Sequence, residues 1–254
     1  DFTTIEEAAE TVSAVIAAGI VPAALELMDQ QVVRAVEPFA KAGYPLDAAA
    51  VLIVELDGLP AGISREVEAV AAVARECGAR TVRIAADEGE RARIWKGRKG
   101  AFGAIAKIKP SYYLHDTVIP RTRLAEVVTG VNAIAERHGL IVMNVFHAGD
   151  GNLHPLLVFD HREPGVMERV LAAGEEIVRL SVEVGGVLSG EHGIGLEKRR
   201  FMPLLFSEED LAAQRVLRDA FDPDGVANPH KVLPSGSSCG DVQGLPEIPE
   251  GVWV

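Results

Sequence analysis

The sequence predicts an α+β fold in which helices cover one face of an antiparallel sheet. Strand-like and helix-like segments alternate irregularly along the 254 residues, without the regular order of a parallel sheet. The clearest pair of strands, IVMNVFH at 141–147 and HPLLVFD at 154–160, is joined by a short glycine-containing segment, as in a hairpin. No internal repeat of fixed period is present.

Helices are indicated by capping residues and by apolar residues at helical spacing. The first follows a Thr-x-x-Glu capping pattern and ends at a glycine. Ser64 and Ser207 are predicted caps, and Pro164 lies near the start of another helix. The predicted helices cover residues 3–19, 21–39, 64–79, 89–108, 121–140, 164–186 and 207–222.

Strands are predicted where short β-branched or alternating runs end at turn residues. Besides the hairpin, they are AAAVLIVELDG at 48–58, TVRIAAD at 81–87 and SYYLHDTVIP at 111–120. We expect one domain over residues 1–234, with a helical segment at its C-terminal end. Residues 235–254 have loop composition and are predicted to form an irregular tail.

Composition and charge exclude several classes of function. A formal charge of −12 argues against nucleic-acid binding, which needs Lys and Arg to neutralise phosphates. The two cysteines cannot form a disulfide framework and suit a reducing compartment. No apolar run reaches the roughly 20 residues of a membrane span. The chain opens without Met or a signal peptide, so we expect a cytoplasmic protein and a start inside a longer chain.

The segment HAGDGNLH contains the first candidate metal ligands. If Asp150-Gly151 is a two-residue turn, His147 pairs directly with His154 across the hairpin. Their Cβ atoms would then lie roughly 5 Å apart on one face of the sheet, close enough to share a metal ion. A longer turn, or two hydrogen-bonded loop histidines without a metal, would also fit this segment.

The segment SGEHGIG supplies a third candidate ligand. Glycines at 190, 193 and 195 let the backbone adopt positive φ around Glu191 and His192. One carboxylate and two imidazoles form a three-ligand set with open positions, as in catalytic zinc, iron or manganese sites. His192 would project differently from Glu191 and is a candidate general base. A solvated glycine-rich loop is the simpler alternative.

Arg98 is a candidate for binding a substrate carboxylate, because guanidinium offers a planar fork of donors. A surface role for this arginine is equally compatible with its spacing. Neither a dinucleotide fingerprint nor a phosphate-binding loop is present.

Five motifs, taken together, resemble one known family. They are IWKGRKGAF, YYLHDTVIPR, NVFHAGDGNLHP, SGEHGIGLEK and FDPDGVANPHKVLP. In this order they resemble the C-terminal half of FAD-linked 2-hydroxy-acid oxidoreductases of the vanillyl-alcohol oxidase superfamily, of the glycolate oxidase and D-lactate dehydrogenase type. The likeness covers about residues 20 to 234 and implies a ferredoxin-like cap or substrate domain.

The resemblance implies a role for each candidate residue. His147, His154 and Glu191 match ligands of one divalent metal, His192 the catalytic base, and Arg98 the arginine that binds the substrate carboxylate. Asn228 and Lys231 match a segment that lies against FAD. The usual Asn-Pro-Gly-Lys reads Asn-Pro-His-Lys here, so His230 stands where a glycine is expected.

The implied reaction is oxidation of a small 2-hydroxy acid, such as glycolate or D-lactate, to the 2-oxo acid. His192 would take the hydroxyl proton, and FAD would accept a hydride. The FAD-binding domain is expected to precede this chain, so these 254 residues alone are expected to be inactive.

The resemblance also suggests partners: a homo-oligomer, and further oxidase subunits that include an iron-sulfur electron acceptor and link the protein to the inner face of the membrane. From the residues alone, two other functions remain open: a flavin-independent metal-dependent hydrolase or oxygenase, and a non-catalytic, metal-stabilised binding domain.

Overall fold

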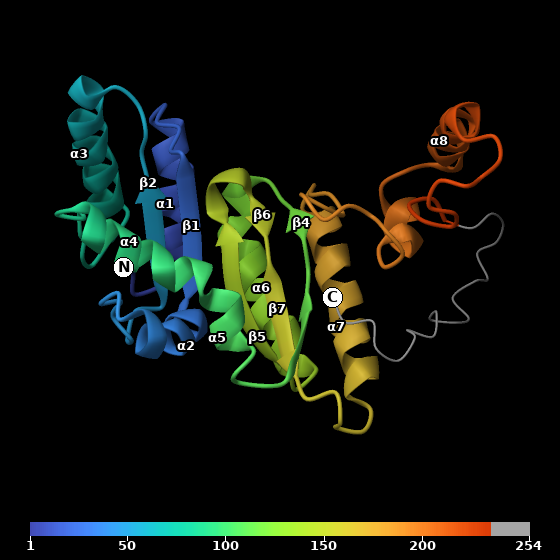
Figure 1. Ribbon diagram of the computed structural model, residues 1–254, viewed down its shortest axis with the longest axis horizontal. Coiled ribbons are helices and arrows are strands. Elements are labelled where there is room, and N and C mark those ends of the chain that lie inside the picture. Colours follow the sequence, from blue (N-terminus) through green and yellow to red (C-terminus); the bar gives the residue numbers. More distant parts are fainter. Residues whose placement is uncertain (235–254) are drawn as a thin grey trace. The chain divides into compact units, whose positions relative to one another are not determined.

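A computed structural model describes residues 1–234, and the predicted tail lies outside the described residues (Figure 1). The chain forms two compact units, one over residues 1–193 and the other beginning at Ile194. The first unit contains the sheet and most of the helices. In the part of the chain that is described, no helix is both long enough and apolar enough to cross a membrane.

The predicted α+β class is confirmed, since all strand pairs in the first unit are antiparallel. β1 lies between β2 and β5, and β5 continues the sheet through β6 to β4 at one end and through β7 to β3 at the other. The strands are β1 (Ala24–Asp29), β2 (Ala50–Glu55), β3 (Ser111–Leu114), β4 (Thr117–Val118), β5 (Ile141–His147), β6 (Asn152–Leu153) and β7 (Pro155–Phe159).

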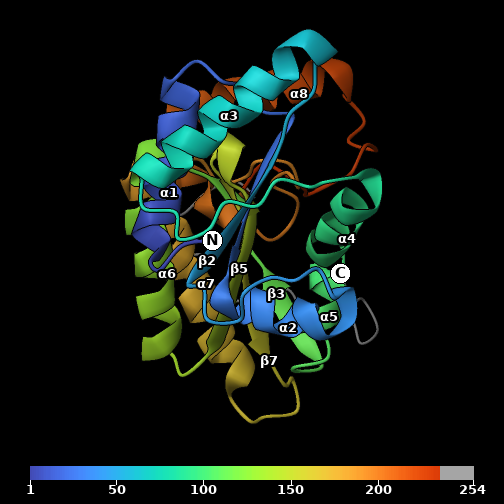
Figure 2. The ribbon, with the colours of Figure 1, turned by 90° about the vertical axis from the view of Figure 1, so that its left-hand side faces the viewer.

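Helices cover both faces of this sheet rather than the single face predicted (Figure 2). On one face α1, α6 and α7 enclose a core that includes Leu27 and Phe146; on the other, α2 and α5 enclose a core around Met28 and Val145. The central strands are therefore buried on both sides, which explains their nearly continuous apolar sequences. The helices of this unit are α1 (Ile5–Ala17), α2 (Gln30–Ala40), α3 (Pro60–Glu76), α4 (Glu88–Lys99), α5 (Ala101–Ile105), α6 (Leu124–Arg137) and α7 (Val166–Glu183).

The largest error of the sequence prediction concerns residues 21–39, predicted as one helix. The segment ALELMD is strand β1, and α2 begins directly after it. The Asp29 side chain accepts a hydrogen bond from the N–H of Val32 and so caps α2. Pairing with β2 on one side and β5 on the other stabilises the strand, and this tertiary contact is not visible in local periodicity.

Other differences are local. Residues 81–87 form no strand, the segment 111–120 is interrupted at His115 and Asp116, and the helix predicted for 89–108 divides at Gly100. Helix α3 begins before Ser64, which is therefore not its cap. The predicted Thr-x-x-Glu capping box is present at Thr4, and Ser207 caps α8 as predicted, with Asp210 completing a capping box.

The second unit contains the short 3-10 helix η3 (Arg199–Leu204) and helix α8 (Glu208–Phe221). The segment that follows α8 is held locally: Asp222 accepts hydrogen bonds from the N–H groups of Val226 and Ala227. Arg199 donates a hydrogen bond to the carbonyl of His230, which ties this segment to η3.

Candidate functional site

The hairpin turn between the two motif histidines is longer than predicted. Residues Ala148–Asp150 form the 3-10 turn η2, followed by Gly151 with φ 69°. His147 consequently pairs with Asn152, and the predicted direct pairing with His154 is wrong. The register differs by two residues, and since side chains alternate with period two, both histidines still point to the same face.

The two imidazoles therefore meet as diagonal neighbours rather than as a direct pair. Their ring centroids lie 5.3 Å apart with the planes nearly perpendicular. His154 is buried, and His147 is partly exposed. Burial lowers the pKa of the His154 imidazole, which favours the neutral form that can act as a metal ligand.

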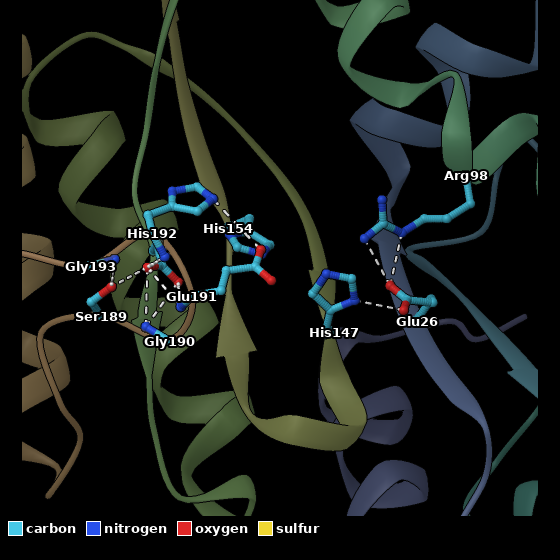
Figure 3. A network of polar contacts seen from close by, with 10 residues as sticks. Glu26, Arg98, His147, His154, Ser189, Gly190, Glu191, His192 and Gly193 are labelled. Carbon is cyan, nitrogen blue, oxygen red and sulfur yellow. Dashed lines mark hydrogen bonds and ion pairs between the residues drawn. The ribbon is translucent and has the colours of Figure 1, made fainter. Parts of the chain in front are cut away.

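Glu191 completes a cluster with these two histidines, as the sequence predicts (Figure 3). One of its carboxylate oxygens lies 3.0 Å from Nε2 of His154. One possible ligand atom from each of His147, His154 and Glu191 lies within 4.8 Å of the other two. Two nitrogens and one oxygen at this spacing could hold a zinc, manganese or iron ion and would leave coordination positions for further ligands.

The loop that carries Glu191 is organised by Asp116, a residue that was not predicted to belong to the site. Asp116 is fully buried between β3 and β4. Its carboxylate accepts hydrogen bonds from four donors: the Ser189 hydroxyl (2.6 Å) and the N–H groups of Gly190 (3.0 Å), Glu191 (3.2 Å) and His192 (2.9 Å). Successive N–H groups converging on one anion fix the backbone of the loop.

The glycine at 190 is required by packing. A Cβ atom there would lie 2.5 Å from Oδ1 of Asn152, the cross-strand partner of His147. The loop therefore packs closely against the hairpin that carries the two histidines, and the glycine-flanked pattern of SGEHGIG reflects this close approach.

His192 lies at the edge of the cluster, with its side chain 43% exposed. Its ring stacks on the ring of His154 at a centroid distance of 5.4 Å. Nε2 of His192 is 3.6 Å from the Glu191 carboxylate, too far for a hydrogen bond. An imidazole beside the cluster and open to solvent is suited to exchange protons with a ligand bound there.

Arg98 does not lie on the surface: its side chain is 9% exposed and forms an ion pair with Glu26 of β1. Nε and Nη2 of Arg98 lie 2.9 and 2.8 Å from the same oxygen of Glu26, Oε2. The other oxygen, Oε1, lies 2.7 Å from Nδ1 of His147. Glu26 thus connects the predicted substrate-binding arginine, Arg98, to a predicted metal ligand, His147. Figure 3 shows Arg98 and His147 on either side of Glu26.

This network changes the proton affinities of its members. Burial alone would raise the pKa of the Glu26 carboxyl, but the hydrogen bond from His147 and the charge of Arg98 lower it below its ordinary value. The hydrogen bond to Glu26 raises the pKa of the His147 imidazole. Glu26 is therefore ionised at neutral pH.

Asn228 and Lys231 lie in the second unit, both exposed, with Nζ of Lys231 3.4 Å from Oδ1 of Asn228. His230, which replaces the expected glycine, has φ 64° and so keeps the left-handed conformation that a glycine favours. Asn228 and Val232 also have positive φ. The flavin contact of this segment stays a prediction.

The comparisons with known proteins agree with the predicted family. The family described as "FAD linked oxidases, C-terminal domain" matches residues 1–232. The glycolate oxidase subunit GlcD of Escherichia coli (strain K12) is 45% identical over 94% of this chain and 48% of its own length. The GlcD of Bacillus subtilis (strain 168) is 38% identical over 91% and 49%. A probable mitochondrial D-lactate dehydrogenase of Danio rerio is 27% identical over 91% and 47%.

Solved structures share the fold at low identity. A substrate-bound p-cresol methylhydroxylase superposes with a TM-score of 0.68 at 12% identity, covering 92% of this chain and 52% of that one. The 4-ethylphenol oxidase of Gulosibacter chungangensis gives 0.63 at 14% identity, over 92% and 53%. The chain spans about half the length of the curated relatives it matches. The chain belongs to the FAD linked oxidases, C-terminal domain family.

Proposed function

We propose that the chain forms the substrate-binding half of a flavoprotein that oxidises a small 2-hydroxy acid, of the glycolate or D-lactate type, to the 2-oxo acid. The observation that carries the proposal is the cluster of His147, His154 and Glu191 in a chain of this family, 45% identical to a glycolate oxidase subunit. A 2-hydroxy acid carries a hydroxyl and a carboxylate oxygen on adjacent carbons, so it can occupy two open positions of a three-ligand metal site.

Each residue of the site has its own role in such a reaction. When bound, a divalent ion supplies positive charge that lowers the pKa of an attached hydroxyl, and FAD supplies the hydride acceptor. His192 takes the hydroxyl proton on its solvent-facing ring. Arg98 orients the substrate carboxylate through Nη1, the guanidinium nitrogen not committed to Glu26.

The partners follow from the same proposal. Asn228 and Lys231 contact FAD, and further subunits, including an iron-sulfur protein, accept the electrons. GlcD is by its name a subunit of glycolate oxidase, which supports an assembly of several chains. A homo-oligomeric state, and a cytoplasmic location with attachment to the inner face of the membrane through such subunits, belong to the same proposal.

The function is tested by anaerobic flavin reduction. FAD-loaded protein, containing this chain together with its flavin-binding part, is mixed with glycolate, D-lactate or L-lactate, and the absorbance of oxidised flavin is followed. We expect a 2-hydroxy acid to bleach the flavin, whereas acetate, which has no hydroxyl group, serves as the matched control and leaves it oxidised. A protein whose flavin stays oxidised with every 2-hydroxy acid, or that turns over substrate without flavin, contradicts the proposal and favours a hydrolase or oxygenase.

A further inference from the structure

Glu26 is placed between the metal cluster and the guanidinium of Arg98 by the register of the sheet. In the pairing of β1 with β5, Glu26 is the direct cross-strand partner of His147. Side chains of directly opposed residues project from the same face, and here that face also carries His154. Glu26 is 6% exposed, and apart from Asp29 at the end of β1 it is the one charged residue of this strand.

Each carboxylate oxygen of Glu26 has its own cationic or imidazole partner. Oε1 lies 2.7 Å from Nδ1 of His147, and Oε2 accepts hydrogen bonds from Arg98. An ionised carboxylate can only accept hydrogen bonds, so Nδ1 of His147 must carry the proton. In the neutral ring Nε2 then keeps its lone pair, which is the form that a metal ligand requires.

The buried ion pair by itself does not explain why a glutamate stands here. A buried pair gains little over well-packed apolar side chains, because both charges lose their hydration. The carboxylate has a larger effect on the geometry of the site, because it fixes both the ring of His147 and the plane of the Arg98 guanidinium.

We propose that Glu26 is a positioning residue of the site. It selects the Nδ1–H tautomer of His147, so that Nε2 is free to bind a metal. It also fixes the position of the Arg98 guanidinium relative to that ring. The inference rests on the proposed function, because it assigns His147 as a ligand. It goes beyond that function in naming the residue that couples the metal site to the carboxylate-binding arginine.

The first test compares metal affinity in three variants of the 254-residue chain by calorimetric titration with Zn²⁺. Glu26→Gln keeps the shape but turns one oxygen into a donor, and we expect about 10- to 100-fold weaker binding. Arg98→Met removes the buried cation and leaves the contact with His147, so its affinity should stay within about threefold of that of the wild type. The double variant should bind as weakly as Glu26→Gln, and circular dichroism checks that each variant is folded.

Two results of this titration would overturn the inference. Glu26→Gln with wild-type affinity would show that the carboxylate does not prepare His147. Restored affinity in the double variant would show that the loss came from an uncompensated Arg98 charge, which is a purely structural effect.

The second test reads the tautomer directly in metal-free protein, by ¹H–¹⁵N NMR of the imidazoles at alkaline pH, with His147 assigned through His147→Gln. We expect Nδ1 protonated in the wild type and a shift toward Nε2 protonation in Glu26→Gln. An Nε2-protonated ring in the wild type contradicts the proposal. If wild-type protein bound no Zn²⁺, the proposed function would fail. The tautomer of His147 would still show whether Glu26 positions that ring.

Discussion

His192→Ala is expected to lower the rate of flavin reduction by a 2-hydroxy acid about 10²- to 10⁴-fold, the usual cost of losing a positioned acid-base group. The ring of His192 stacks on His154 and stays 3.6 Å from the Glu191 carboxylate, so it lies beside the cluster without belonging to it. Metal affinity should therefore stay within about threefold of that of the wild type, because the three ligands are unchanged.

The matched control is His161→Ala, which removes an imidazole that is hydrogen-bonded to Ser111 at the start of β3. This variant should keep the wild-type rate. A His192→Ala protein with near-normal flavin reduction would show that another group takes the proton. Loss of the metal in that variant would show that His192 is a ligand rather than a base.

Asp116→Ala is expected to release the loop that carries Glu191 and His192. The substitution removes the acceptor for the Ser189 hydroxyl and for the N–H groups of residues 190–192. Each hydrogen bond to a charged group is worth about 1.5–3 kcal/mol. Because the loop can reach solvent, we expect the cost to appear as local opening, with about 100-fold faster amide exchange at residues 190–192 for a loss of about 3 kcal/mol.

Hydrogen exchange followed by mass spectrometry measures this effect in the chain without metal. Asp29→Ala is the matched control, since Asp29 is also a buried carboxylate that accepts N–H donors, those of Val32 and Asn144. That variant should lose stability without selective exchange at 190–192. Unchanged protection of the loop in Asp116→Ala would contradict the role assigned to Asp116.

The fold could be predicted where local signals and tertiary structure agree. The Thr-x-x-Glu pattern at the start of the chain and the cap residue Ser207 marked two helices correctly, because a cap is formed by residues close in sequence. Strand β1 was predicted as helix because its apolar residues suit either period, and only pairing with β2 and β5 decides between them. The strand predicted at 81–87 does not form, which shows that β-branched residues alone do not make a strand.

In the candidate site, too, the residues marked by local motifs were predicted and those placed by tertiary contacts were not. His147, His154 and Glu191 were predicted together, and the cluster forms although the hairpin register was wrong by two residues. A wrong register of odd size would have separated the histidines onto opposite faces. The residues that support the site were missed, since Glu26 lay in the strand predicted as a helix and Asp116 in a segment predicted as one continuous strand. The one signal available for Glu26 was a charged residue among the apolar residues of ALELM.

The binding of one divalent metal by His147, His154 and Glu191 is measured by calorimetric titration of purified protein with Zn²⁺. About one ion per chain is expected in the wild type and in the surface variant His161→Ala. His147→Ala and Glu191→Ala should each lose most of this binding, since the two remaining ligands coordinate the ion much more weakly than three. Wild-type stoichiometry and affinity in both of these variants would show that His147, His154 and Glu191 do not hold the ion.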